Sequence, residues 1–295
     1  MKLSFTTLDA FTTTRYAGNP VAIVRVPAES KALLSQAQKQ AIAKEFNLSE
    51  IVFLHLPSPS GSFASVNIDI FTSHAEVPFA GHPTIGASYF VLQILSQPTT
   101  TIFTKAGPIP ISQNPATNYV EAIIPQKFHI HQVTYSCELA SAPCPVASIV
   151  DGMSFIFVVL PDLPTLARAD KNLSKDTYDP SLLDPGWQNG LVATMYLVSQ
   201  GIDEFGRRAY RTRMFGTRED PGTGSASSAL GCFLALQESK EQRAGPFTYA
   251  FAQGVEMGKR NDIGVEVTRN AAGDGIEKVV LSGPAVKVME GTLEI

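Results

Sequence analysis

The chain has 295 residues, of which 44% are hydrophobic and 17% are charged, and its formal net charge is −4. This length suits two domains, and the composition excludes general disorder. The negative charge and the lack of a lysine or arginine run argue against a nucleic-acid-binding surface.

The longest apolar stretches, 155–160 and 191–198, fall far short of the about 20 residues that span a bilayer. Residues 1–3 lead into alternating sequence without the apolar core of a signal peptide. We therefore expect a cytoplasmic protein that does not bind membranes.

The cysteines and histidines do not predict a metal site. Cys137, Cys144 and Cys232 are odd in number, widely spaced and without a Cys-x-x-Cys pair. Such a pattern favours reduced structural thiols over disulfides or zinc ligands. No ligand spacing relates the four histidines outside the motifs below, so we expect surface or loop positions for them. They are His55, His74, His129 and His131.

The first part of the chain alternates strand patterns with helical ones. Apolar alternation predicts strands at 3–7, 21–24, 51–54, 66–70, 100–103 and 119–124. The cluster of glycine, asparagine and proline at 15–20 predicts a sharp turn. Apolar residues recur at helical spacing between Leu33 and Phe46, with Ser30 as the expected N-cap and Asn47 as the stop.

Glu50 lies where the predicted strand 51–54 begins, directly before four apolar residues. Partial burial raises the pKa of a carboxyl group toward the range useful for proton transfer, which makes Glu50 a candidate acid/base. The alternative is a solvated glutamate at a strand edge, because most glutamates are exposed.

Two similar stretches each precede an apolar, helix-like run. In Glu219-Asp220-Pro221-Gly222-Thr223-Gly224-Ser225-Ala226, Asp220 is the expected N-cap, with Pro221 at the first helical position. Gly81-His82-Pro83-Thr84-Ile85-Gly86-Ala87 aligns with it when Pro83 is set against Pro221, Gly86 against Gly224 and His82 against Asp220. Because backbone N–H groups and the helix dipole both attract anions, the sequence predicts two helix starts aimed at one shared cleft.

The second part repeats the order of the first. Residues 126–145 contain no long periodic run, so we place the domain boundary there, giving halves 1–125 and 126–284, with 285–295 returning to the first half. Strands are predicted at 154–160, 191–199, 207–215, 247–251, 264–267, 279–281 and 286–289. Residues 161–164 predict a turn or a short helix start, and 171–190 a surface loop.

These motifs resemble the phenazine-biosynthesis PhzF-like family, whose fold is that of diaminopimelate epimerase. The resemblance spans nearly the whole chain and is most specific at 76–84 and 219–226. Weaker matches are Asp9-Ala10-Phe11, Gly18-Asn19-Pro20, Ser49-Glu50 before Phe53, Gln253-Gly254 and Met257-Gly258. It implies an α+β fold of two pseudo-symmetric halves, each a β-roll around a central helix, with the active-site cleft between them. It also implies a homodimer, no metal and no organic cofactor.

Carried over by residue, the resemblance implies that Glu50 is the acid/base and that His82, Asp220 and Ser225 are the supporting catalytic groups. Gly81, Asn19, Gly222, Thr223 and Gly224 would contact the substrate. Simpler roles stay open: His82 and Asp220 as helix caps or satisfied polar groups, Ser225 as a helix-capping hydroxyl and Asn19 as a turn former. Glu76 is expected to be structural.

Departures from the family pattern affect the expected substrate more than the fold. The loop 216–219 is short, Ile51 replaces a common threonine, and Lys259-Arg260-Asn261 stands where Arg-Pro-Ser is common. The sequence thus predicts a cofactor-independent isomerase acting on a small carboxylate-bearing metabolite. The alternative is a non-enzymatic homodimer that binds a small anion or a protein partner. A two-cysteine racemase, a serine hydrolase and a P-loop enzyme are each disfavoured, because their motifs are absent.

Overall fold

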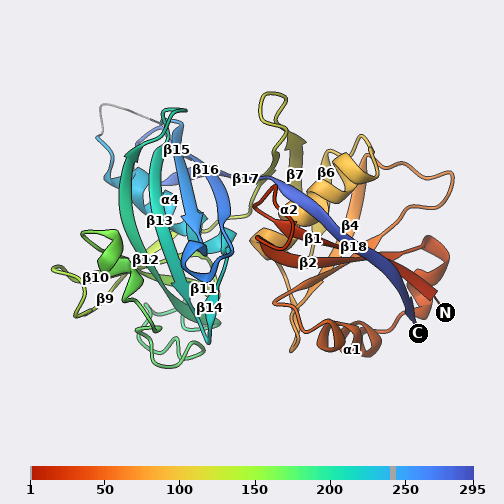
Figure 1. The fold of residues 1–295 in the computed structure, drawn as a ribbon, viewed down its shortest axis with the longest axis horizontal. Helices are drawn as coiled ribbons and strands as arrows, with labels where there is room; N and C mark the ends of the chain where they lie inside the picture. The colour runs from red at the N-terminus through yellow and green to blue at the C-terminus, as the bar shows by residue number, and fades with distance from the viewer. Residues whose placement is uncertain (1, 240–243) are drawn as a thin grey trace. The chain divides into compact units, whose positions relative to one another are not determined.

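Strands predominate in the computed structural model, which describes residues 2–239 and 244–295 (Figure 1). The chain divides into two units. Unit 1 contains the residues up to Ile124 together with Ser282–Ile295, and unit 2 contains Pro125–Leu281. Within the described residues, no helix is both long and apolar enough to cross a membrane.

Unit 1 is a β-roll around one helix. Its strands are β1 (Lys2–Ala10), β2 (Asn19–Val26), β3 (Ile51–His55), β4 (Ser65–Phe71), β5 (Glu76–Val77), β6 (Thr101–Thr104), β7 (Gly107–Gln113), β8 (Val120–Ile123) and β18 (Ala285–Glu294). Its α-helices are α1 (Gln36–Phe46) and α2 (Gly81–Tyr89), and a π-helical turn, Phe90–Ile94, extends α2. α2 packs against β1, β2, β3, β8 and β18.

Unit 2 has the same plan around the helix α4 (Gly224–Gln237). Its strands are β9 (His129–Tyr135), β10 (Cys144–Val150), β11 (Met153–Val159), β12 (Leu191–Ile202), β13 (Arg208–Phe215), β14 (Glu219–Asp220), β15 (Phe247–Gln253) and β16 (Asn261–Arg269). A short helix, α3 (Leu163–Ala167), follows β11, and the chain returns to unit 1 within β17 (Ile276–Gly283). α4 packs against β10, β11, β15 and β16.

The strand pairings of the two units correspond one by one. In unit 1, β2 runs parallel to β3, β3 antiparallel to β4, and β4 antiparallel to β5 and parallel to β6. In unit 2, β11 runs parallel to β12, β12 antiparallel to β13, and β13 antiparallel to β14 and parallel to β15. The predicted two-halved α+β fold is therefore confirmed.

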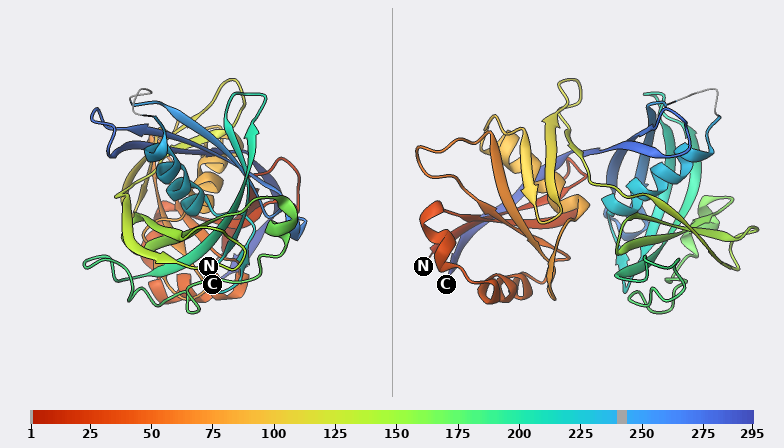
Figure 2. Two further views of the ribbon diagram at one scale, coloured as in Figure 1. Left: turned by 90° about the vertical axis from the view of Figure 1, so that its left-hand side faces the viewer. Right: turned by 180° about the vertical axis from the view of Figure 1, so that it is seen from behind.

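The closing strand of unit 1 comes from the end of the chain. β18 pairs with β1 in antiparallel fashion from Lys2 opposite Glu294 to Ala10 opposite Ala285. Both views in Figure 2 place the start of the chain beside its end, within this unit. The last strand therefore completes the wall around α2.

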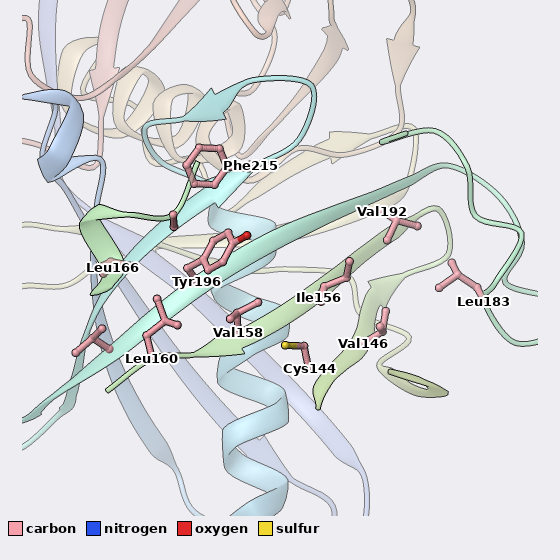
Figure 3. Close-up of a cluster of buried hydrophobic side chains, with 12 residues drawn as sticks. Cys144, Val146, Ile156, Val158, Leu160, Leu166, Leu183, Val192, Tyr196 and Phe215 are labelled. Carbon is pink, nitrogen blue, oxygen red and sulfur yellow. The ribbon is translucent and has the colours of Figure 1, made fainter. Parts of the chain in front are cut away.

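Unit 2 buries apolar side chains on both faces of β11. Ile156 and Val158 join a cluster that includes Tyr196 and Leu166, shown in Figure 3. Phe157, between them in sequence, contacts Phe233 of α4, with ring centroids 5.4 Å apart. Because successive side chains of a strand point to opposite faces, β11 holds α4 on one side and this cluster on the other.

Two details of the elements differ from the sequence predictions. The first helix is capped by Ser35, because the Ser35 side chain accepts a hydrogen bond from the Gln38 N–H and Gln38 bonds back in a capping box. Ser30, the predicted cap, lies in a preceding 3₁₀ helix, Ala28–Leu33. Asn47 ends the helix as predicted, in the left-handed conformation. The strands β5, β7, β9, β10 and β14 were not predicted.

Candidate active site

The same strand, turn and helix precede each central helix. Glu76 of β5 pairs with Phe71, and Glu219 of β14 pairs with Phe215. Three residues then separate each short strand from its helix, α2 or α4. The two stretches therefore align as Glu-x-Pro-x-x-Gly, which places His82 and Ser225 at equivalent positions, each the second residue of its helix.

This alignment corrects the one predicted from sequence. Pro83 is the third residue of α2, whereas Pro221 lies three residues before α4, so these prolines are not equivalent. Pro221 corresponds instead to Pro78. Asp220 is not the N-cap of α4, because it belongs to β14 and the N-cap position is occupied by Thr223.

Gly86 is also misplaced by the predicted alignment, which set it against Gly224. Gly86 lies in the middle of α2, and a Cβ atom there would come within 2.6 Å of the Val21 Cγ1 atom. This glycine lets α2 approach β2 closely. In unit 2, Gly231 has the corresponding use, because its Cβ would lie 2.8 Å from Val265 Cγ1 of β16.

Glu50 and His82 lie together in unit 1. Glu50 directly precedes β3, and His82 is at the start of α2. The Glu50 Oε2 atom is 3.7 Å from His82 Nε2, and the two side chains are 21% and 6% exposed, respectively. His82 Nε2 is buried and makes no hydrogen bond to any described residue. The distance of 3.7 Å is too long for a hydrogen bond. A small shift of either side chain would bring the two groups close enough to share a proton.

Among the described residues of unit 2, no carboxylate takes the position that corresponds to Glu50. Ala22 pairs with Ile51 in unit 1, and Met153 pairs with Leu191 at the corresponding place in unit 2. The residue before Leu191 is Gly190, whose φ is +71° and whose Cβ would lie 2.1 Å from the Gly152 carbonyl oxygen. A side chain does not fit there, so the repeated fold places a carboxylate at this position only in unit 1.

Asn19 and Gly81 are both buried in unit 1. Asn19 begins β2 and pairs with Ala10, and its residue is 1% exposed. It is therefore a strand residue, and the turn predicted at 15–20 ends before it. Gly18, at the end of that turn, has no space for a side chain, since its Cβ would lie 2.4 Å from the Ala10 carbonyl oxygen.

The start of α4 forms a second polar group of residues, in unit 2. Asp220 Oδ2 accepts a hydrogen bond of 2.6 Å from the Thr223 hydroxyl, and Asp220 Oδ1 accepts one of 3.4 Å from the Gly222 N–H. Gly224 and Ser225 are the first two residues of α4, and both are buried. Asp220 therefore shapes the turn that leads into the helix.

Gln253 anchors this turn and was not singled out from the sequence as a site residue. It is fully buried at the end of β15. Its Nε2 donates to the Asp220 carbonyl oxygen (2.7 Å) and to the Thr223 hydroxyl (3.0 Å), and its Oε1 accepts from the Thr223 N–H (3.0 Å). The available signal was the polar residue that ends an alternating strand, in the Gln253-Gly254 match.

Asn261 holds the same turn from β16. The buried Asn261 Nδ2 donates to the Pro221 carbonyl oxygen (2.7 Å) and to the Lys259 carbonyl oxygen (2.8 Å). A Cβ on Gly222 would lie 2.4 Å from Asn261 Oδ1, which explains the glycine at this position. The side chain of Asn261 thus supports the turn before α4.

Glu76 and Glu219, the equivalent glutamates of the two units, each bind neighbouring side chains. Glu219 accepts two hydrogen bonds from Arg213, of 2.7 and 2.9 Å, and this pairing is the main cause that raises the pKa of Arg213. Glu76 accepts hydrogen bonds from Gln36 (2.9 Å) and Lys105 (3.2 Å). The structural role expected for Glu76 agrees with these contacts.

The predicted surface or loop positions are wrong for two of the four histidines outside the motifs. His55 and His131 are buried on strands, 8% and 4% exposed, whereas His129 lies on β9 with a partly exposed side chain. His74 is exposed in a loop, as predicted.

The cysteines are free, as predicted, and burial raises the pKa of Cys144 to about 11.

Comparisons with known proteins agree with the fold. A family model described as phenazine biosynthesis-like protein matches residues 8–291. An uncharacterized isomerase of Mesorhizobium japonicum is 31% identical over 97% of both chains. The trans-2,3-dihydro-3-hydroxyanthranilate isomerase of Pseudomonas aeruginosa is 27% identical, over 97% of this chain and 98% of that protein. The crystal structure of a PhzF-family phenazine biosynthesis protein from Bacillus anthracis covers 100% of both chains with a TM-score of 0.76 and 24% identity. The chain therefore belongs to the phenazine biosynthesis-like family of isomerases.

Proposed function

We propose that this chain is a cofactor-independent isomerase that moves a proton within a small carboxylate-bearing metabolite, with Glu50 as the acid/base. The observation that carries the proposal is the placement of Glu50 within 3.7 Å of the buried His82 Nε2 atom. A partly buried carboxylate beside an imidazole Nε2 atom that makes no hydrogen bond to the described residues is a pair able to hold and release a proton.

The proposed reaction is redox-neutral. Glu50 removes a proton from a carbon of the substrate, and the electron pair of the broken C–H bond moves into the adjacent conjugated system. The protonated Glu50 then delivers that proton to another carbon, where a new C–H bond forms. Because the oxidation state of the whole molecule does not change, the step requires no oxidant or reductant.

In this scheme His82 supports Glu50. Its imidazole lies at the start of α2, where backbone N–H groups lack intrahelical acceptors. A proton on His82 Nε2 would stabilise the Glu50 carboxylate until Glu50 accepts a proton from the substrate. The interaction between the two side chains would then be released. Exclusion of water from the buried surroundings would strengthen this interaction.

We propose that the start of α4 binds the substrate carboxylate. Asp220 and Thr223 fix the turn, and the first N–H groups of α4, with the Ser225 hydroxyl, are suited to an anion. Gly222 and Gly224 would leave the backbone accessible to the ligand. Holding the substrate at its carboxylate would orient the carbon acid, and such orientation lowers the barrier to proton transfer.

The test is proton exchange with solvent. The protein is incubated in heavy water with a panel of cyclic, unsaturated carboxylic acids, and deuterium incorporation is followed by mass spectrometry and NMR. The panel begins with trans-2,3-dihydro-3-hydroxyanthranilate, the compound after which the relative from Pseudomonas aeruginosa is named. Enzyme-dependent deuterium at carbon in one acid and its isomer supports the proposal. Tight binding of an acid without any exchange would contradict the proposal and favour a binding protein. We expect the protein to be a homodimer whichever outcome is found.

A further inference from the structure

Three potential metal ligands meet in unit 2, on elements that do not contain the proposed catalytic residues. His129 and His131 belong to β9, and Asp184 lies in the segment between α3 and β12. Their ligand atoms all lie within 4.8 Å of one another. His129 Nε2 is 2.8 Å and His131 Nδ1 is 3.8 Å from Asp184 Oδ2.

The strand places the two imidazoles on one side. Residues two apart on a strand share a face, so His129 and His131 project together. Their rings are in edge contact, with centroids 4.7 Å apart. The His131 side chain is completely buried, whereas that of His129 is 34% exposed, so the group has one closed side and one side open to solvent.

Hydrogen bonds fix which nitrogen of His131 presents a lone pair. The Asp184 backbone N–H donates to Nδ1 over 3.3 Å, so Nδ1 is an acceptor. The proton of the neutral ring is then on Nε2, which lies 2.8 Å from the Ser148 hydroxyl oxygen. Nδ1 therefore faces the Asp184 carboxylate with a lone pair, the state in which imidazole binds a metal.

Outer contacts hold the other two ligands in place. Trp187 stacks on the His129 ring, with centroids 4.8 Å apart and an interplanar angle of 9°. Asp184 Oδ1 accepts a hydrogen bond of 3.1 Å from the Gln132 N–H, which leaves Oδ2 directed at the imidazoles. Metal ligands are commonly oriented by such hydrogen bonds.

We propose that His129, His131 and Asp184 bind one divalent transition-metal ion, with Zn²⁺ as the best match. Two imidazole nitrogens and one carboxylate oxygen are ligands that Zn²⁺ takes in tetrahedral sites at about 2.0 to 2.2 Å. Bringing the three ligand atoms to that distance from the ion requires small side-chain movements. The weak hydrogen bond from the Asp184 N–H to His131 Nδ1 would be replaced by a bond from Nδ1 to the ion. Water completes the coordination on the solvent side. The ion would link β9 to the segment carrying Leu183 and Trp187, which packs on the hydrophobic cluster of Figure 3.

The experiment is Zn²⁺ titration of the full chain without a polyhistidine tag. Protein stripped of metal with EDTA is titrated with zinc chloride in a calorimeter, and the bound metal is counted by mass spectrometry after gel filtration. We expect one Zn²⁺ per chain. His129→Asn and Asp184→Asn should each weaken Zn²⁺ binding by at least about tenfold. Even the loss of a residue that only hydrogen-bonds to a metal ligand typically weakens metal binding by about that factor.

The matched control is His74→Asn, which removes an exposed loop histidine and should leave Zn²⁺ affinity unchanged. Asp184→Asn keeps the Oδ1 acceptor for Gln132, and the partly exposed His129 can be replaced without opening the core, so circular dichroism should show folded variants. No uptake by the wild type, equal affinity in either ligand variant, or loss on changing His74 would each overturn the proposal.

Discussion

Replacing Gln253 with leucine should destabilise unit 2 far more than an ordinary surface substitution. Gln253 is fully buried and makes three hydrogen bonds of 2.7 to 3.0 Å to Asp220 and Thr223. Leucine fills similar space but cannot donate or accept. Two backbone groups, the Asp220 carbonyl and the Thr223 N–H, then lose their partner inside the protein.

The size of the effect follows from those two groups. Leaving a buried donor or acceptor unsatisfied costs about 1 to 3 kcal/mol each, so Gln253→Leu should lower the free energy of unfolding by about 2 to 6 kcal/mol. The control is Gln200→Leu in the same unit, where an exposed side chain makes one hydrogen bond to the neighbouring Ser199 carbonyl. That change should cost less than about 1 kcal/mol.

Urea unfolding followed by tryptophan fluorescence measures this difference. Trp187 is the single tryptophan of the sequence and belongs to unit 2, as does Gln253, so its emission reports on the right unit. If Gln253→Leu and Gln200→Leu shift the unfolding midpoint equally, the hydrogen bonds of Gln253 do not hold the turn before α4, and the reasoning fails.

Two further predictions concern unit 1. Burial raises the pKa of Asp69, but hydrogen bonds from His55 and Lys39 outweigh it and lower that pKa from 3.8 to about 2. The ionised carboxylate thus stabilises the fold by about 2 kcal/mol above pH 4, and this is lost as the pH falls toward 2. The difference in urea stability between the wild type and Asp69→Asn should shrink accordingly; a constant difference from pH 6 to pH 2 would refute this. Gly86→Ala should destabilise by about 1 to 3 kcal/mol, because the new methyl group would meet Val21 at 2.6 Å, and a stabilised variant in thermal unfolding would show that helix propensity dominates.

The sequence was sufficient for most elements and for the family. Strands such as Ser65–Phe71 alternate strictly, and Asn47 is a clear helix stop. The capping error was avoidable, since Gln38 follows Ser35 at the capping-box spacing. β7 escaped prediction because Pro108 and Pro110 interrupt its pattern. In the strand, both prolines pair with β6, whereas β8 pairs with residues 111–113.

The alignment of the two helix starts was ambiguous at the level of residues. Pro78 and Pro83 both precede the apolar run, and the pairing of Glu76 and Glu219 with their preceding strands shows that Pro78 corresponds to Pro221. The identical glutamates would have given the same answer from sequence.

Other parts of the candidate site depend on long-range contacts. Gln253 reaches Asp220 and Thr223 across 30 or more positions, and no local pattern indicates that contact. The approach of Glu50 to His82 is of the same kind, because strand β3 and helix α2 are brought together only by the closed roll. Sequence reasoning singled out Glu50 from its place before a strand and His82 from the paired motifs, and the family resemblance gave them roles. Their proximity is a result of the fold.

The most direct test of the account is the deuterium-exchange rate of Glu50→Gln on the substrate that the heavy-water screen identifies. Glutamine keeps the size of the side chain but cannot accept a proton, so exchange should fall by at least about 10²-fold while substrate binding persists. Glu45→Gln, an exposed glutamate in α1, is the matched control and should exchange at the wild-type rate. Wild-type exchange in Glu50→Gln would contradict the proposed role of Glu50.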